Sequence, residues 1–167
     1  MQITMYDTLV PIAIRMLGSL SAILDKGAAF AEAKKIEPKV LLDARLAPDM
    51  FALTRQVQIA CDILKGGVAR LGGVEVPKHE DNESSFAELK ARVGKVQAFV
   101  KSVPAAGFAG SEDRAITLVM RTGDMHFNGA DYLRFFVLPN FYFHIATTYA
   151  ILRHNGVELG KMDFIGH

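Results

Sequence analysis

The stretch FAELKARVGKVQAFV, residues 86–100, places an apolar side chain at every third or fourth position. These positions are Phe86, Leu89, Val93, Val96 and Val100. Such a spacing gathers the side chains on one face of an α-helix. Ser85 and Glu88 form the sequence pattern of a capping box at its start, and Pro104 follows its end. The stretch therefore predicts an amphipathic helix over residues 85–103.

Three further segments have the same helical spacing, at residues 8–34, 48–71 and 139–154. Pro48 and Asp49 are typical of the first turn of a helix, and Pro139 predicts the start of the last one. The pairs Gly72-Gly73 and Asn155-Gly156 indicate helix ends. Four long amphipathic helices predict a four-helix bundle.

Between the third and last helices the period changes to two. Ile116, Leu118 and Met120 alternate with other residues, and Met125 and Phe127 alternate again after a Thr-Gly-Asp turn. This pattern predicts a short β-hairpin. Residues 72–83 and the tail after residue 156 are expected to be irregular. The expected fold is all-α, a four-helix bundle with a small β-hairpin, in one domain over residues 1–167.

Composition excludes several classes of function. The chain has 19 Lys and Arg and 18 Asp and Glu, and this balance leaves no basic face for nucleic acid. Cys61 is the single cysteine and reads as a small buried hydrophobe. The apolar run at residues 8–24 is interrupted by Arg15 and lacks a preceding basic region, so neither a signal peptide nor a membrane span is expected. We expect a cytoplasmic protein.

Polar residues occur where the helical stripes predict apolar ones. Asn140 and His144 are four residues apart and share one face of the last helix, and Gln56 lies beside the stripe of the second. Two interpretations remain open. The three side chains could form a hydrogen-bonded core network, or they could line a polar pocket. On the third helix, Lys90, Arg92 and Lys95 are expected to face solvent.

Several motifs resemble one known family. PNFYFH at 139–144, ILRHNG at 151–156, RLAPDM at 45–50, GKMDF at 160–164 and Gln56 are similar to a branch of the DinB-like (YfiT-like) bundles. That branch is known as a domain of unknown function. The resemblance implies the same bundle fold over the whole chain and carries no established reaction.

The wider superfamily includes metal-dependent enzymes, such as thiol-dependent transferases, with one His on the second helix and His-x-x-x-His on the last. The resemblance places Gln56 and Asn140 where two of those ligands stand and keeps only His144. Amide oxygens are weak ligands for zinc or nickel. We therefore expect no tightly held metal, with His144 the only strong candidate ligand. Asp49 could offer a carboxylate.

Three functions follow from this interpretation. The first is binding of a small molecule in a pocket formed by Gln56, Asn140 and His144, without a tightly held metal. The second is a metal-dependent enzyme, of the thiol-dependent transferase or hydrolase type, with an altered ligand set. The third is a dimeric interaction protein with a vestigial pocket. None of them fixes a substrate.

Two further expectations concern the surroundings of the pocket. Arg45 and Asp49 in RLAPDM, with Lys161 and Asp163 in GKMDF, are expected at its mouth, or else to pair and hold the tail down. A homodimer is also expected, because the apolar stripe of the first helix is wider than the core requires and some of its apolar side chains would remain exposed.

Overall fold

The computed structural model describes residues 3–166 and confirms a helical bundle with a small hairpin late in the chain. Its elements, in chain order, are α1 (Met5–Lys34), α2 (Pro38–Leu42), α3 (Leu53–Gly72), α4 (Phe86–Ser102), η1 (Ala105–Phe108), β1 (Ile116–Leu118), β2 (Met125–Phe127), α5 (Gly129–Asp131), η2 (Tyr132–Val137), α6 (Leu138–His154) and α7 (Lys161–Ile165).

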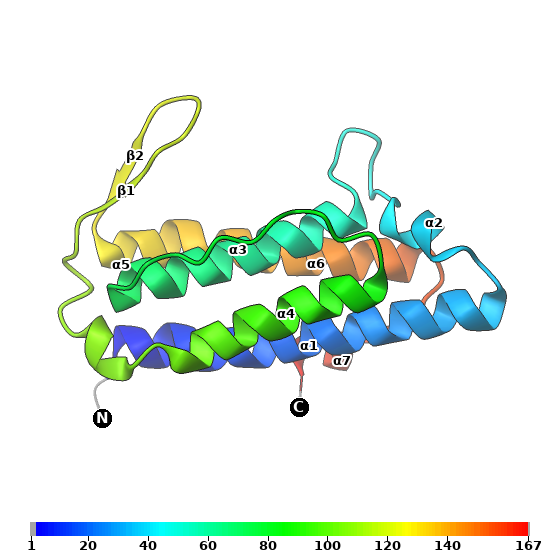
Figure 1. Ribbon diagram of the computed structural model, residues 1–167, viewed down its shortest axis with the longest axis horizontal. Coiled ribbons are helices and arrows are strands. Elements are labelled where there is room, and N and C mark those ends of the chain that lie inside the picture. Colours follow the sequence, from blue (N-terminus) through cyan, green and yellow to red (C-terminus); the bar gives the residue numbers. More distant parts are fainter. Residues whose placement is uncertain (1–2, 167) are drawn as a thin grey trace.

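The four long helices lie side by side along one axis (Figure 1). α3 packs mainly on α6 and α4, and α1 packs mainly on α4. α3 and α4 run in the same direction, so residues 73–85 return along the bundle to connect them (Figure 1). The hairpin and the connection between α2 and α3 both project from the side formed by α3 and α6 (Figure 1).

Several predicted helix ends are confirmed by their hydrogen bonds. Ser85 Oγ accepts from the backbone N–H of Glu88 at 3.2 Å, as an N-cap side chain should. Gly73 ends α3 with φ of 69°, a left-handed conformation that glycine adopts at no steric cost.

The predicted hairpin is present. Its paired strands β1 and β2 are antiparallel, with Ile116 opposite Phe127. His126 is exposed, as its alternation with Met125 and Phe127 predicts.

The second long helix begins later than predicted. Pro48 and Asp49 lie in the connection before α3, which starts at Leu53. The backbone N–H of Leu53 donates to Ala44 O at 2.9 Å, so the connection closes into a loop before the helix begins. Arg45 Nη1 donates to Met50 O at 2.6 Å inside that loop. Hydrogen bonds between residues nine and five apart thus override the local helix-start signal.

The last long helix, α6, begins at Leu138, within one residue of the predicted start, and further helical turns precede it without a break. α5, η2 and α6 form one continuous helical stretch of 26 residues, Gly129–His154. Pro139 therefore lies inside a helix, where its ring removes an N–H and crowds the carbonyl of Phe135. The wider π-helical turns of η2, just before Pro139, accommodate that ring.

The tail is also more regular than predicted. Residues 161–165 form the short helix α7, which packs on α1. Phe164 contacts the ring of Tyr149, with the ring centroids 6.2 Å apart, and Tyr149 Oη donates to Leu159 O at 3.2 Å. These contacts attach the tail to both α1 and α6.

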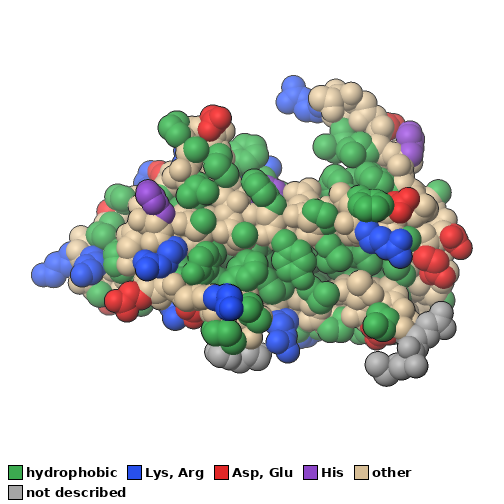
Figure 2. All heavy atoms as spheres, turned by 180° about the vertical axis from the view of Figure 1, so that it is seen from behind, with side chains coloured by type: hydrophobic (Ala, Val, Ile, Leu, Met, Phe, Trp, Pro, Cys, Tyr) green, Lys and Arg blue, Asp and Glu red, His purple; other side chains and the backbone are tan. Residues whose placement is uncertain are grey.

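The core joins one apolar stripe from each long helix, including the fully enclosed Leu17, Leu64, Leu89 and Ile145. Met5–Lys34 and Gly129–His154 are long and apolar enough to cross a membrane, but about half of each apolar window (50% and 44%) is buried in the bundle. They are core helices of a soluble fold. Hydrophobic side chains also gather across the middle of the back face (Figure 2). The cytoplasmic location stays a prediction.

Candidate functional site

The structure brings together two of the predicted site residues. Gln56, in the first turn of α3, meets His144, in the middle of α6. His144 Nδ1 lies 2.7 Å from Gln56 Oε1. Gln56 is 1% exposed and His144 8%, so this hydrogen bond is buried in the seam between the two helices. The pair satisfies the requirement that buried polar groups have partners, as the core-network interpretation of these residues predicts.

The surrounding contacts determine which nitrogen of His144 carries the proton. Gln56 Nε2 donates to Phe51 O at 3.1 Å, and this bond turns Gln56 Oε1 toward the imidazole. An amide oxygen can only accept a hydrogen bond. His144 Nδ1 is therefore the protonated nitrogen, and Nε2 carries the lone pair.

The Nε2 nitrogen of His144 is open. It makes no hydrogen bond to a residue within 3–166 and is not among the enclosed polar atoms, so it reaches solvent. Burial, and secondarily the positive charge of Arg55, hold the pKa of His144 below its ordinary value of 6.5. The imidazole is thus neutral at pH 7, and Nε2 can accept a proton or a hydrogen bond.

Asn140 lies one helical turn before His144 on the same face. It is half-buried, and its side chain makes no hydrogen bond to another described residue. The nearby hydroxyls differ in this respect, because Thr147 donates to Phe143 O at 2.8 Å and Thr148 to His144 O at 2.9 Å. Asn140 is therefore the side chain beside His144 with both donor and acceptor capacity unused.

The residues expected at the mouth are placed less closely. Arg45 is exposed and does not contact Gln56 or His144. Its guanidinium donates to the carbonyl of Met50, the residue before Phe51, whose own carbonyl accepts from Gln56. Asp49 is exposed and forms no hydrogen bond or ion pair with a described residue. Asp163 instead pairs with Lys26 of α1 at 2.7 Å. The tail is thus held by α1, as the pairing alternative predicts, but with a different partner.

The surface hollows of about 350 to 800 Å³ in residues 3–166 lie elsewhere, because neither Gln56, Asn140 nor His144 lines any of these five. What the structure offers at His144 is an accessible nitrogen on the α3–α6 seam. A ligand there would lie against the seam rather than inside a deep pocket.

A three-ligand metal centre does not fit these side chains. Both amide atoms of Gln56 are already engaged, by His144 and by Phe51 O. Asn140 offers only a neutral oxygen. Within residues 3–166, no three His, Cys, Asp or Glu side chains form a group that could hold a metal ion. One imidazole remains as a strong ligand, and we derive no chemistry through a metal.

The thiol offers no alternative site. Cys61 is fully buried in α3, as the sequence predicts, and burial raises its pKa to about 12. A thiol that stays protonated at pH 7 is not a nucleophile.

The sequence interpretation of Arg92 was wrong. Arg92 is only 2% exposed, and its guanidinium contacts the carboxylates of Asp62, Asp81 and Glu83 at 2.8 to 3.0 Å. Burial alone would raise the pKa of Glu83, but hydrogen bonds from Gln58 and Arg92 hold it below its ordinary value. This charged cluster, in which Arg92 is buried, Glu83 is largely buried, and Asp62 and Asp81 are partly exposed, holds the connection at residues 80–83 on α3 and α4.

Two comparisons with known proteins give matches. Residues 5–165 match the family described as Domain of unknown function (DUF1993). The chain is also similar to a crystal structure of a DinB family member protein from Shewanella denitrificans, with a TM-score of 0.91 and 46% sequence identity. That match covers 97% of this chain and 92% of the other. No curated protein matches. Neither description names a ligand or a reaction.

Proposed function

This chain belongs to the DUF1993 family and has the DinB-like fold that its motifs predict, and from that premise we propose a binding function. The proposed site takes a small molecule that donates a hydrogen bond to Nε2 of His144, beside Asn140, without a tightly held metal. The observation that carries the proposal is the hydrogen bond in which Gln56 Oε1 accepts from His144 Nδ1–H. This bond keeps the proton on Nδ1 and leaves Nε2 open.

The chemistry of the two side chains narrows the ligand. A neutral imidazole nitrogen accepts from a hydroxyl, thiol, amide or ammonium group. The Asn140 amide can donate and accept at once, so it suits a ligand whose donor lies next to a carbonyl or hydroxyl oxygen. Gln56 acts as a positioning residue, because it fixes the tautomer and the ring orientation while both of its own polar atoms are engaged.

The metal-dependent alternative makes a different prediction for the same nitrogen. A divalent ion would take the Nε2 lone pair and would need further ligands, of which the seam supplies Asn140. Single imidazoles bind such ions weakly, so we expect well under one equivalent of zinc. The variant carrying Gln56→His and Asn140→His would add imidazoles at both positions, and we expect it to bind zinc more tightly, increasingly so as pH rises through about 6.5.

The test follows the ring nitrogens of His144 by 15N NMR in the full chain. A panel of small phenols, alcohols, thiols and primary amides is added, with Zn²⁺ as a separate probe. We expect a panel member to shift Nε2 in the unmodified chain and to lose this effect in Asn140→Ala; in His144→Gln, binding followed through the compound's own NMR signals should be lost. The exposed His126→Gln is the matched control and should change nothing. Stoichiometric zinc on the unmodified chain would favour the metal-dependent enzyme, and an Nε2 signal untouched by every compound would contradict the binding function.

A further inference from the structure

One face of α1 is left without a partner. Six of its exposed positions form a row at spacings of three or four residues, and Lys26, also exposed, lies beside this row and pairs with Asp163. The row consists of Pro11, Arg15, Gly18, Ala22, Asp25 and Ala29. A 30-residue helix with three positions this small on its open side presents its backbone to close approach by another helix.

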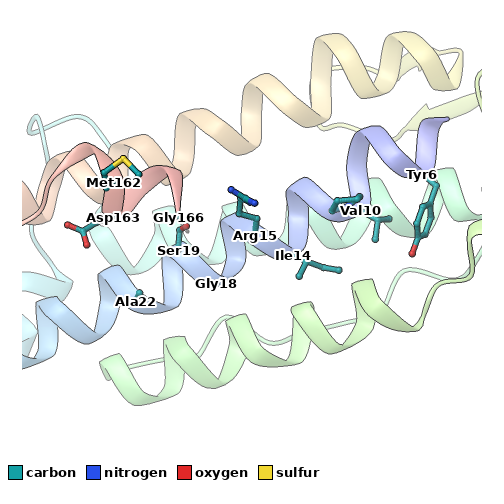
Figure 3. A pocket seen from close by; sticks show the side chains of 11 residues that line it. Tyr6, Val10, Ile14, Arg15, Gly18, Ser19, Ala22, Met162, Asp163 and Gly166 are labelled. Carbon is teal, nitrogen blue, oxygen red and sulfur yellow. The ribbon is translucent and has the colours of Figure 1, made fainter. Parts of the chain in front are cut away.

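A groove follows the N-terminal part of the row, from Pro11 to Ala22. It has a volume of about 610 Å³ and is lined by α1 residues from Tyr6 to Ala22, by Met162 and Asp163 of α7, and by Gly166 just after α7. Figure 3 labels Gly18 and Ala22 along α1 and shows the Arg15 side chain projecting from the same stretch of the helix. Ser19, which is 6% exposed, also lines the groove, and its Oγ is enclosed without a hydrogen-bond partner. The groove is thus apolar and close to the backbone, with one unpaired hydroxyl.

Two charged side chains on the row are not fully neutralised by partners within one chain. Arg15 is exposed and forms no ion pair or hydrogen bond with a described residue. Asp25 contacts Lys90 of α4, yet its side chain remains 57% exposed. One cation and one anion therefore face outward from the same row, ten residues apart.

The row is symmetric about the level of residue 20. Reversing the helix about that level exchanges Gly18 with Ala22, Arg15 with Asp25, and Pro11 with Ala29. A second copy of α1 laid antiparallel on the first would consequently bring Arg15 of each chain to the level of Asp25 of the other. A parallel arrangement would instead set Arg15 against Arg15 and Asp25 against Asp25. Two-fold symmetry makes such pairs occur twice in one interface.

We propose that the occupant of this groove is a second copy of the chain, packed antiparallel through α1 with Gly18 and Ala22 at the centre and two Arg15–Asp25 ion pairs flanking it. The proposal specifies the interface of the expected homodimer and is independent of the His144 site. Like charges across such an interface oppose association, and opposite charges fix its register.

Glycine substitutions provide the first test. A Cβ at Gly18 meets only Gln97 Nε2, at 3.9 Å, so the single chain tolerates a side chain there. A Cβ at Gly94, on the exposed face of α4, meets nothing within 4 Å. Gly18→Leu should fill the groove and raise the dimer dissociation constant at least about tenfold, whereas Gly94→Leu should leave it unchanged. Thermal unfolding followed by circular dichroism verifies that both variants fold.

Charge reversal provides the second test and fixes the register. Light scattering and sedimentation of the full chain, at concentrations on the order of tens of micromolar, should give twice the chain mass. Arg15→Asp and Asp25→Arg should each weaken the dimer about tenfold or more, and the double variant should restore it. Three outcomes overturn the proposal: a monomeric unmodified chain, a dimer indifferent to Gly18→Leu, or charge reversals that do not rescue each other.

Discussion

α3 buries polar side chains on two of its sides, and the two sides differ in charge. Toward α6, the neutral amide of Gln56 meets the neutral imidazole of His144 through one hydrogen bond of 2.7 Å. Toward α4, Asp62 meets the guanidinium of Arg92, which also contacts Asp81 and Glu83. In the first cluster, Nε2 of His144 remains accessible. In the second, both terminal nitrogens of Arg92 donate to other residues of the protein.

This difference in charge distinguishes a binding site from a structural ion-pair cluster. Charges that are buried together hold each other at a high desolvation cost, so removing one leaves the others uncompensated. Neutral groups can be buried with fewer partners and can leave one atom open without such a cost. The α3–α4 cluster therefore suits a structural role that secures residues 80–83, and the α3–α6 pair suits binding.

Arg92→Ala should have the largest effect on stability. It leaves the largely buried Glu83 without its cation, while the partly exposed Asp62 and Asp81 keep Lys65 and Arg55. We therefore expect a loss of about 3 kcal/mol, the low end of the range for a buried ion pair that loses one partner. Urea unfolding followed by circular dichroism measures this loss. Lys90→Ala is the matched control on the same helix, because the Lys90–Asp25 pair is exposed and should contribute less than about 1 kcal/mol. Equal losses for the two variants would show that the Arg92 cluster contributes no more than a surface pair.

The sequence predicted the stripes better than the exceptions to them. The four helices, the hairpin and the Gln56–His144 contact follow from apolar spacing, because periodicity reports directly which side chains face the core. Arg92 shares the row of Leu89 and Val96, at i+3 and i+7, and this placement was a signal that it is buried. Its charge argued for solvent, and only the folded connection at residues 80–83 supplies the carboxylates that reverse that argument.

Helix boundaries were harder to predict for a related reason. A proline at the first turn of a helix and a proline inside a π-helical widening have the same local sequence, so Pro139 could not distinguish the two. The open Nε2 of His144 was equally hidden, since it depends on the Phe51 carbonyl that turns the Gln56 amide. Tertiary contacts decide such details, and a single sequence does not display them.

Gln56→Leu should lower the free energy of unfolding by an intermediate amount. It tests the neutral Gln56–His144 pair in the way that Arg92→Ala tests the charged cluster. The change keeps the volume of the side chain and removes both of its hydrogen bonds, leaving the Nδ1–H of His144 and the carbonyl of Phe51 unpaired. Burying an unsatisfied polar group costs about 1 to 3 kcal/mol. The same urea experiment measures it, with Gln97→Leu as a control, because Gln97 Nε2 makes a single bond of 3.0 Å to Ile14 O. A loss equal to that of Arg92→Ala would remove the distinction between the two clusters.

Gln56→Glu tests the same contact through the titration of His144, because the carboxylate keeps an acceptor for Nδ1–H and loses only the donor to Phe51 O. In the unmodified chain, the pKa of His144 lies below 6.5 in the folded state, so the unfolded chain takes up this proton first as pH falls. Its contribution to the free energy of unfolding therefore declines as pH falls below about 6.5. A carboxylate at position 56 would accept from Nδ1–H and favour the imidazolium, raising the folded pKa of His144 above 6.5.

The sign of the pH dependence then reverses. In Gln56→Glu, the stabilisation from His144 should be fully present below pH 6.5 and should be lost as pH rises through the higher folded pKa. NMR titration of the ring nitrogens measures the pKa, and His126 serves as an exposed internal reference in the same spectra. If the pKa of His144 stayed below 6.5 in the variant, Oε1 of residue 56 would not be the partner of Nδ1. Nε2 would then no longer be the assigned open nitrogen, and the binding function would lose the contact on which it depends.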